Sequence, residues 1–386
     1  MARYAFVTWD GGGNTPPAVG IAQELKRRGH EVLFLGYEAQ RKRFETQGFS
    51  FVTLRRSGSF DIYEAHDPAA RIAGLMAHVW ACPEHLDDIP DAIADVTADV
   101  LIVDCMMQGA LAGVSRLSIP IVVLAHSSIG GLIPPPESPM GAARLAATNN
   151  LRSQADLPGL TRLTEAWIEL PTLVTTIPDL DPTAAEANAR VRYVGPIFEQ
   201  FSNMNWNASW ETGDDRPLVL VSFTTTRLWD QRGRIRNTLD GLRNEPVRVL
   251  VTAADPGEVG VLPANAAIRA FVPHGVVLSA AALTITHAGH GTVTASLAFG
   301  VPLVTLANPA ADQPFLAATL QRLGAAIALD GESEASAIRA AVREVLHQHS
   351  YADAARTLAA AIHAAPGVTG AAVELERLRG GSKTLS

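Results

Sequence analysis

The feature that most constrains this chain is a strand, a glycine turn and a helix that lead directly into a second strand. Residues 3–8 are short, aromatic and β-branched, and three glycines follow at 11–13. Residues 16–28 carry apolar side chains at helical spacing, Gly29 ends that pattern, and residues 31–36 are typical of another strand. Strands joined through a helix in this way pair in parallel with a right-handed crossover. The N-terminal half is therefore predicted to be a doubly wound α/β sheet.

The alternation of strands and helices continues along the chain. In the N-terminal half, a short apolar run at 100–103 is closed by Asp104, and another strand is expected at 119–125. The C-terminal half repeats the pattern, with strands expected at 218–223, 247–252, 268–272, 283–287 and 301–306. Helices are expected between them at 275–281, 290–299 and 313–323. The segments 51–80 and 127–138 lack periodicity or are rich in glycine and proline, and are predicted to be irregular.

A chain of 386 residues is too long for one compact core and suits two domains. We expect a Rossmann-like acceptor domain at 1–198, a polar linker at 199–216 and a Rossmann-like nucleotide-sugar domain at 217–386. The last of these would end in alanine-rich helices and a flexible tail. Open parallel sheets bind ligands beyond the carboxyl ends of their strands. Two such sheets that face each other would make one interdomain cleft, suited to a reaction between two separately bound substrates.

The overall charge and the cysteine content exclude several classes of function. The formal net charge is −8, and a strongly acidic chain repels phosphate backbones, so no nucleic-acid partner is expected. The two cysteines, Cys82 and Cys105, form neither a disulfide framework nor a zinc pattern, and no metal site is predicted. No apolar run reaches the ~18 to 20 residues that span a bilayer. We therefore expect a cytoplasmic protein without stable membrane association, and the sequence leaves a homodimer open.

The strongest functional signal is the run His287-Ala288-Gly289-His290-Gly291-Thr292, between a predicted strand and a predicted helix. Glycines let the backbone approach an anion closely, and the first turn of a helix favours negative charge. His287 and Thr292 add hydrogen-bond donors for phosphate oxygens. Alone, the run fits equally well a glycine turn beside a buried histidine.

Further motifs follow in a fixed order. Residues Gly300-Val301-Pro302 start the next strand, Asp312-Gln313-Pro314 follow it, and Gly324 closes the next helix. Asp312 and Gln313 place an acceptor beside an amide, a pair suited to vicinal sugar hydroxyls. Asp312 is equally suited to cap the helix that follows.

Together with Val272-Pro273-His274, these motifs resemble the donor-binding signature of nucleotide-sugar-dependent glycosyltransferases with the GT-B fold, most of all the bacterial macrolide-type and natural-product enzymes. The resemblance covers most of the C-terminal half. The N-terminal half matches more loosely, through residues 11–17, residues 29–32 and Asp104.

The resemblance implies a UDP- or TDP-sugar as co-substrate, no cofactor, and inversion at the anomeric carbon without metal. The diphosphate would be held by His287, Gly289, His290, Gly291 and Thr292. Val272 and His274 would flank the base, and Asp312 and Gln313 would hold the sugar. The loop Ser222-Phe223-Thr224-Thr225-Thr226 normally contributes as well, although Thr224 stands where a glycine is common.

One departure from the resembling enzymes concerns catalysis. Those enzymes carry a histidine after the first glycine turn as general base, and an aspartate on a later strand orients it. Asp104 matches the aspartate, but Asn14 stands in place of the histidine, and an amide cannot accept a proton at neutral pH. Either Asp104 or Asp10 is expected to act as the base, with Asp104 slightly favoured. An acidic acceptor such as a phenol would need little help.

No motif assigns the acceptor site. Aromatic and methionine side chains near the predicted mouth of the first sheet suit a flat hydrophobic aglycone, although core packing explains any single one. The weak candidates are Trp9, Phe60, His66, Met76, Trp80, Met106 and His126. A non-catalytic homologue that binds nucleotide and supports a partner glycosyltransferase is the main alternative. A sugar-nucleotide epimerase or a membrane-surface transferase on the same fold is a third.

Overall fold

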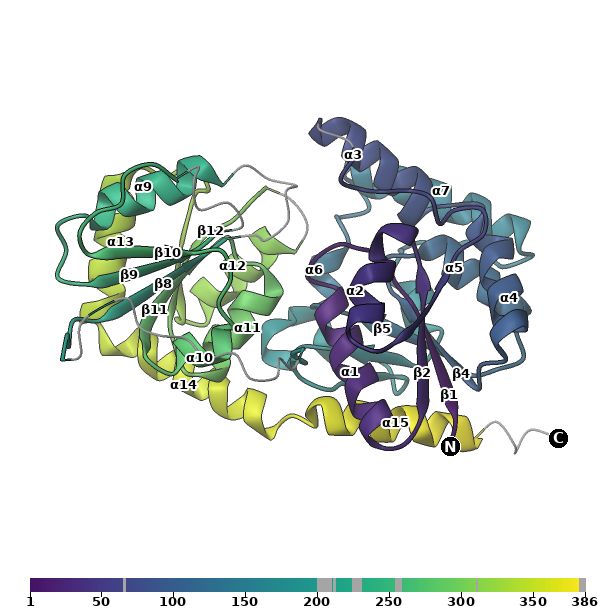
Figure 1. Ribbon diagram of the computed structural model, residues 1–386. Helices are drawn as coiled ribbons and strands as arrows, with labels where there is room; N and C mark the ends of the chain where they lie inside the picture. Colours follow the sequence, from purple (N-terminus) through teal and green to yellow (C-terminus); the bar gives the residue numbers. More distant parts are fainter. Residues whose placement is uncertain are drawn as a thin grey trace. The chain divides into compact units, whose positions relative to one another are not determined.

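The structure is a computed structural model that describes residues 1–64, 67–199, 210, 213–223, 231–253, 259–309 and 312–381. These residues form two compact α/β units (Figure 1). The first unit comprises the described parts of Met1–Pro178, Pro182–Glu199 and Pro366–Ser386, and the second those of Asp179–Asp181 and Gln200–Ala365. Each is called a domain below.

The first domain is built on a seven-stranded parallel sheet with the order β3-β2-β1-β4-β5-β6-β7. Its strands are β1 (Arg3–Val7), β2 (Glu31–Gly36), β3 (Ser50–Thr53), β4 (Val100–Asp104), β5 (Ile121–Ala125), β6 (Thr172–Val174) and β7 (Val191–Tyr193). Its helices are α1 (Thr15–Arg27), α2 (Arg41–Thr46), α3 (Pro68–Leu75), α4 (His85–Val96), α5 (Gln108–Gly113), α6 (Ile129–Leu132), α7 (Pro139–Gln154), α8 (Glu165–Ile168) and α15 (Gly367–Gly381). A π-helical turn, η2 (Met76–Trp80), continues α3.

The second domain repeats the architecture with a six-stranded parallel sheet in the order β10-β9-β8-β11-β12-β13. Its strands are β8 (Leu218–Ser222), β9 (Arg248–Thr252), β10 (Ala266–Arg269), β11 (Ala281–Thr286), β12 (Leu303–Leu306) and β13 (Ala326–Leu329). Its helices are α9 (Arg232–Leu242), α10 (His274–Leu278), α11 (His290–Ala298), α12 (Gln313–Arg322), α13 (Ala335–His347) and α14 (His349–Ala364).

The strand order creates one topological switch point in each sheet. In the first domain the chain winds outward from β1 through β2 to β3, and then returns to place β4 on the other side of β1. In the second domain β8 and β11 are the corresponding neighbours. β4, β5 and β8 are buried along their whole length, as strands covered by helices on both faces must be. Ligands of doubly wound sheets bind beyond the carboxyl ends of the strands at such switch points, so a binding site is expected at each of these two places.

The C-terminal helix corrects the expected domain boundary. Residues 217–386 were predicted to form one domain, but α15 packs against α1 of the first domain, where Ala371, Ala372 and Leu375 join the hydrophobic core. Glu376 completes the contact, accepting hydrogen bonds from Arg28 at 3.0 Å and pairing with His30 at 2.9 Å. The alanine-rich pattern predicted a helix correctly, but helical periodicity alone does not tell which domain the helix covers.

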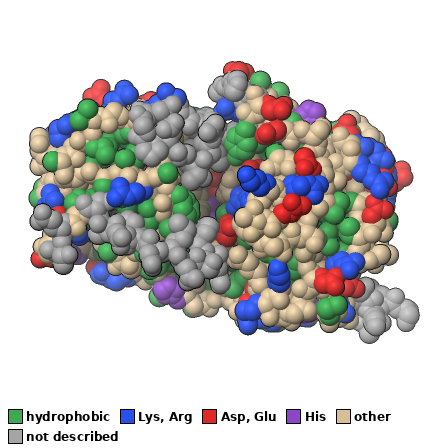
Figure 2. Space-filling view, in the orientation of Figure 1, with side chains coloured by type: hydrophobic (Ala, Val, Ile, Leu, Met, Phe, Trp, Pro, Cys, Tyr) green, Lys and Arg blue, Asp and Glu red, His purple; other side chains and the backbone are tan. Residues whose placement is uncertain are grey.

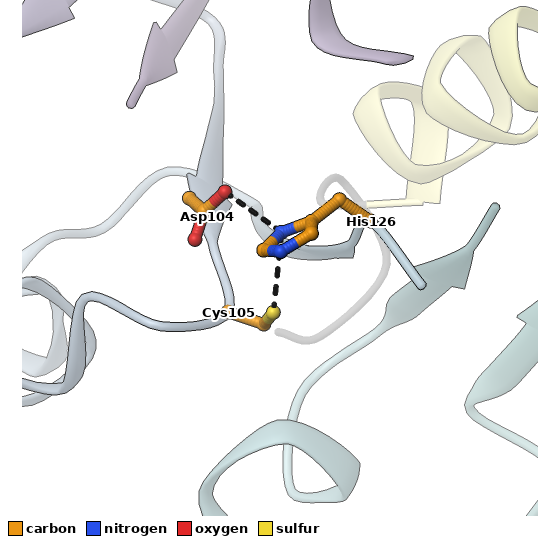
Figure 3. Close-up of side chains that lie close together, drawn as sticks. All are labelled: Asp104, Cys105 and His126. Atoms are coloured by element: carbon orange, nitrogen blue, oxygen red, sulfur yellow. Dashed lines mark hydrogen bonds and ion pairs between the residues drawn. The ribbon is translucent and has the colours of Figure 1, made fainter. Parts of the chain in front are cut away.

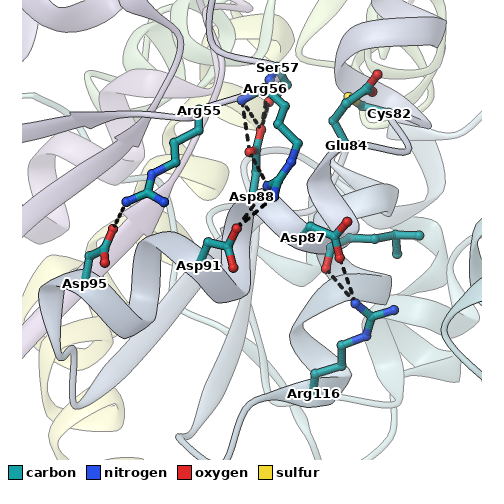
Figure 4. A network of polar contacts seen from close by, with 11 residues as sticks. Arg55, Arg56, Ser57, Cys82, Glu84, Asp87, Asp88, Asp91, Asp95 and Arg116 are labelled. Atoms are coloured by element: carbon teal, nitrogen blue, oxygen red, sulfur yellow. Dashed lines mark hydrogen bonds and ion pairs between the residues drawn. The ribbon is translucent and has the colours of Figure 1, made fainter.

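The segment predicted to be irregular at 51–80 contains β3, α3 and the turn η2, and the loop after β3 is tied firmly to α4 (Figure 4). Asp88, buried on α4, accepts hydrogen bonds from the backbone amides of Arg56 and Ser57 and from the Ser57 hydroxyl. The Arg56 guanidinium contacts both Asp88 and Asp91. A buried carboxylate with this many donors is fully compensated for its desolvation.

One helical stretch, residues 349–380, is long and apolar enough to cross a membrane when judged by length and composition alone. It comprises α14 and α15, which Ala365 separates with an extended backbone conformation. Ala355, Leu358 and Ile362 of α14 are buried, and Ala371, Ala372 and Leu375 of α15 belong to the first core. Only 28% of the apolar window is buried, so packing within the protein accounts for part of its apolar character. On the visible face of the molecule, basic and acidic side chains are interspersed (Figure 2).

Candidate active site

Asp104 lies at the switch point of the first sheet, at the carboxyl end of β4 and beside the turn that follows β1. Asn14 ends that turn at the N-cap of α1, and its Nδ2 donates to Asp104 Oδ2 at 3.0 Å. The same amide donates to the carbonyl of Trp9, while its oxygen accepts from the Gly11 amide. Asn14 is buried and fully engaged, so it shapes the turn and binds the carboxylate that the sequence pattern pairs with a histidine.

His126 is the residue that the structure brings to Asp104. It follows β5, the neighbour of β4, and its Nδ1 lies 3.0 Å from Asp104 Oδ2 (Figure 3). The Cys105 sulfur lies 3.7 Å from the same nitrogen. From the sequence alone, His126 is only a weak candidate for the acceptor site. Strand order was the missing information, because adjacent parallel strands bring Asp104 and His126 to one edge although 22 positions separate them in numbering.

Burial and pairing set the charges of this cluster. Burial alone would raise the pKa of Asp104, but His126, the Met106 amide and the Asn14 side chain lower it below its ordinary value. Burial alone would lower the pKa of His126, but the Asp104 carboxylate and the Cys105 thiol raise it well above its ordinary value. Burial raises the pKa of the Cys105 thiol. Asp104 is therefore a stable carboxylate that favours a charged imidazole beside it.

Asp104, Cys105 and His126 also offer three metal-ligand atoms within 4.8 Å of one another. However, each carboxylate oxygen already accepts two hydrogen bonds. Oδ1 accepts from Trp9 Nε1 at 3.1 Å and from the Met106 amide at 2.9 Å, and Oδ2 accepts from Asn14 and His126. A saturated carboxylate beside a protonated thiol fits a hydrogen-bonded cluster better than a ligand set.

The four hydrogen bonds to the Asp104 carboxylate also bear on whether Asp104 can accept a proton directly from the acceptor. Its side chain is 3% exposed, against 11% for His126, and its lone pairs are occupied by four donors. The other expected base, Asp10, lies closer to solvent. Burial raises its pKa, an effect that Arg43 and the Gly12 amide partly oppose. These contacts favour an orienting role for Asp104 over direct proton transfer.

Several predicted acceptor residues surround this cluster. Trp9 and Met106 are buried next to Asp104 and donate to it, through the indole and the backbone amide respectively. Arg144 of α7 lies over the Trp80 ring at 4.6 Å and donates to the Met106 sulfur at 3.7 Å. Burial lowers the pKa of Arg144 to about 10. This buried arginine carried no signal in the sequence, because its helix has little amphipathic pattern.

Phe60 and Met76 belong to a neighbouring group. The Phe60 ring stacks on His78 of η2 at 4.8 Å and lies 6.1 Å from the Tyr37 ring. Met76 opens the same π-helical turn that ends at Trp80. His66 lies outside the described residues.

In the second domain, the predicted donor residues gather at the switch point between β8 and β11. Ser222 ends β8, and its hydroxyl lies 3.1 Å from His274 Nε2. His287 follows β11 and contacts the backbone of Ser222. Burial lowers the pKa of His287 to about 4 and also lowers that of His274, so both rings are neutral at pH 7. Thr224 and Thr225 lie outside the described residues.

The turn from His287 into α11 has the geometry that the glycines predict. Ala288 adopts a left-handed conformation with φ of 64°, and Gly289 is the N-cap of α11. A Cβ on Gly289 would lie 2.5 Å from His287 Nε2, whereas a Cβ on Gly291 would meet nothing within 4 Å. His290 and Thr292 lie in this first turn, and open space lies beside Gly291 between them.

The remaining donor candidates follow β12 and β10. Asp312 is the N-cap of α12 without a side-chain cap hydrogen bond, and the Gln313 side-chain oxygen accepts from the Asn308 amide at 3.1 Å. Asn308, which sequence reasoning missed, also accepts from the buried Arg234. Val272 is buried in the core, so only its backbone is available beside His274.

Known proteins resemble this chain in sequence and in fold. Residues 237–378 match the family described as erythromycin biosynthesis protein CIII-like, C-terminal domain. The chain is 28% identical to 4'-demethylrebeccamycin synthase of Lentzea aerocolonigenes over 393 residues, which cover 90% of this chain and 92% of that protein.

Two solved structures share the fold across nearly the whole chain. The glycotransferase of kitacinnamycin superposes with a TM-score of 0.80 at 22% identity, covering 98% of both chains. The calicheamicin glycosyltransferase CalG4 superposes with a TM-score of 0.79 at 22% identity, covering 99% of both. Fold, family match and relatives together identify the chain as a glycosyltransferase of the GT-B fold that resembles the bacterial enzymes of natural-product biosynthesis.

Proposed function

We propose that this protein transfers a sugar from a UDP- or TDP-sugar to a small hydrophobic natural product, with inversion at the anomeric carbon and without metal. The observation that carries the proposal is that each domain, taken by itself, has a polar cluster at the switch point of its sheet. One contains Asp104, Asn14 and His126, and the other contains Ser222, His274 and His287.

The second cluster supports binding of a diphosphate. The amides at the start of α11 and the helix dipole favour an anion there, and the open space beside Gly291 leaves room for it. His287 is neutral, so it would act as a hydrogen-bond donor rather than as a charge. Asp312 and Gln313, at the start of α12, would receive the sugar hydroxyls.

These groups can also stabilise the departing nucleoside diphosphate. Fixed donors and a helix N-terminus aimed at a developing negative charge lower the barrier without reorganising. Removing one such donor costs ~10²- to 10³-fold in kcat. The proposal therefore assigns to α11 and His287 the part that a divalent cation plays in metal-dependent transferases.

The first cluster supports binding of the acceptor. Trp9, Met106 and Trp80 give flat or polarisable apolar surfaces around Asp104 and Arg144. The relatives named 4'-demethylrebeccamycin synthase and, from Streptomyces fradiae, demethyllactenocin mycarosyltransferase support an acceptor of the natural-product class.

The experiment is a transfer panel in the presence of EDTA. Purified protein is mixed with UDP- and TDP-sugars and with phenolic and macrocyclic aglycones, and products are detected by mass. A glycosylated product that survives EDTA and is lost in His287→Ala supports the proposal. Nucleotide binding without product from any pair, lost in His287→Ala, would instead favour a non-catalytic partner protein, the alternative that Asn14 suggests.

A further inference from the structure

We propose that His126 is the general base of this enzyme, taking the place of the histidine that Asn14 replaces. The proposal rests on the proposed function and adds to it the residue that accepts the acceptor proton. Three observations of the first domain carry it: the pairing of His126 with Asp104, the engagement of the other groups in the cluster, and the position of Asp104 at the switch point with His126 at the carboxyl end of the adjacent strand β5.

The pairing fixes the imidazole in the orientation that a base requires. Nδ1 faces Asp104 Oδ2 at 3.0 Å, and the contact of the ring with the Cys105 sulfur also runs through Nδ1. A proton on Nδ1 that is held by a carboxylate leaves the lone pair on Nε2 in the neutral ring. Nε2 is thus the atom left for a substrate hydroxyl.

The other members of the cluster are less suited to take the proton. Asn14 is an amide, and Asp104 uses both oxygens for four donors. The Cys105 thiol is buried, and its raised pKa keeps it protonated. The His126 side chain is more exposed than that of Asp104, and its Nε2 is not used in the contacts with Asp104 and Cys105.

The step balances as a single displacement. The acceptor oxygen attacks the anomeric carbon while its proton moves to Nε2 of His126. The bond from the anomeric carbon to the diphosphate oxygen breaks, and its electron pair leaves with the nucleoside diphosphate. The imidazolium that forms is stabilised by the Asp104 carboxylate through Nδ1–H.

The charges around His126 predict how the rate depends on pH. Asp104 and Cys105 face the ring, and Arg144 acts on Cys105 from α7. Because the carboxylate raises the pKa of His126, the ring holds a proton at low pH and cannot accept another. The rate should therefore rise with pH as the ring loses that proton.

The test compares His126→Gln with the parent enzyme, using a nucleotide sugar and a phenol that the transfer panel has shown to be an acceptor. The matched control is His30→Gln. His30 also pairs with a carboxylate, Glu376 at 2.9 Å, and has the same 11% side-chain exposure, but it lies next to the amino end of β2.

We expect His126→Gln to lower kcat by ~10²- to 10⁴-fold, the usual worth of a general base, with the KM for the nucleotide sugar unchanged. The rise of rate with pH should disappear, and the loss should shrink for more acidic phenols. His30→Gln should keep the parent's kcat and pH profile. Asp104→Asn should move the rise to lower pH as well as slow the reaction, since it removes the carboxylate that raises the pKa of His126.

A double variant guards against misfolding of the single one. Asn14→His combined with His126→Gln should recover at least ten-fold of the lost kcat, because it restores a ring beside Asp104. If the parent transfers sugar but His126→Gln keeps its kcat and pH profile, the inference is wrong while the proposed function stands. If the parent transfers no sugar to any acceptor, the proposed function fails and the inference fails with it.

Discussion

The Asn14 amide donates a 3.0 Å hydrogen bond to Oδ2 of Asp104, the oxygen that also receives Nδ1 of His126. An amide at the position where the resemblance implies a histidine base thus holds the carboxylate in place. The imidazole beside that carboxylate comes from the end of the next strand, β5.

This relationship predicts that Asn14→Ala lowers the stability of the folded protein. The change removes one donor to Asp104 and leaves the Gly11 amide without its acceptor in a buried turn. An unsatisfied buried group costs ~1–3 kcal/mol, so the free energy of unfolding should fall by about that amount. Urea titration measures this loss. An unchanged midpoint would mean that the turn does not depend on the Asn14 side chain.

Alanine at the two glycines of the donor turn should change stability in opposite directions, while both variants bind nucleotide more weakly. Gly289→Ala places a methyl 2.5 Å from His287 Nε2, so it should displace the ring and weaken nucleotide binding together with stability. Gly291→Ala meets no atom within 4 Å, and alanine favours a helix by ~1 kcal/mol over glycine. That variant should be more stable than the parent and yet bind nucleotide more weakly, because the methyl enters the proposed diphosphate space.

Calorimetric titration with UDP and TDP, together with thermal unfolding, measures both quantities for the two variants. Full nucleotide affinity in Gly291→Ala would place the diphosphate elsewhere.

His287 should make the stability of the protein depend on pH. Its pKa is lowered by burial to about 4 in the folded state, against an ordinary value of about 6.5 in the unfolded chain. The unfolded state therefore binds more protons between these values, and this contribution to stability falls as pH drops from about 6.5 to 4.

His287→Gln should flatten part of that decline when unfolding free energies are measured between pH 4 and 8. His85, whose pKa burial also lowers to about 4, supplies a similar decline from the first domain. An identical pH dependence in the parent and in His287→Gln would show that His287 is not buried as a neutral ring.

Asp88 should contribute to the stability of the fold and take no part in catalysis. Asp88→Ala leaves the amides of Arg56 and Ser57 without their acceptor, and removing one partner of a buried charged network costs ~3–5 kcal/mol. Since contacts with Ser57 and Arg56 outweigh burial and lower its pKa, this stabilisation is present near neutral pH and is lost on acidification. Because the ordinary pKa of an aspartate is about 3.9, the loss sets in below that pH, and unfolding at pH 7 and at about pH 3 should show a smaller difference between variant and parent at the lower pH. Equal differences would contradict the assignment.

Much of the fold could be predicted from the sequence, because long buried strands and glycine stops carry strong local signals. Strand β2 has its predicted bounds, and β4, β8 and β11 lie within one or two residues of theirs. The short strands β3, β6 and β13 were missed, since three or four residues give too little periodicity. The placement of α15 on the first domain depends on tertiary packing, which no local pattern records.

The residues of the candidate site also differ in whether a local sequence pattern predicts them or only tertiary packing brings them together. The donor residues could be predicted because His287, Gly289 and Gly291 are close together in one turn. The pairing of His126 with Asp104 could not, because it arises only when β5 is placed beside β4. Arg144 and Asn308 reach their sites for the same reason, from elements far away in the sequence.

A single displacement inverts the anomeric carbon, so the configuration of the product distinguishes it from retention. The parent enzyme is incubated with an α-linked UDP- or TDP-sugar and an accepted aglycone, and the product's anomeric coupling is read by NMR. We expect a β-glycoside and one nucleoside diphosphate released for each sugar transferred. An α-glycoside would mean retention, and would contradict both the single displacement and the need for a base at His126.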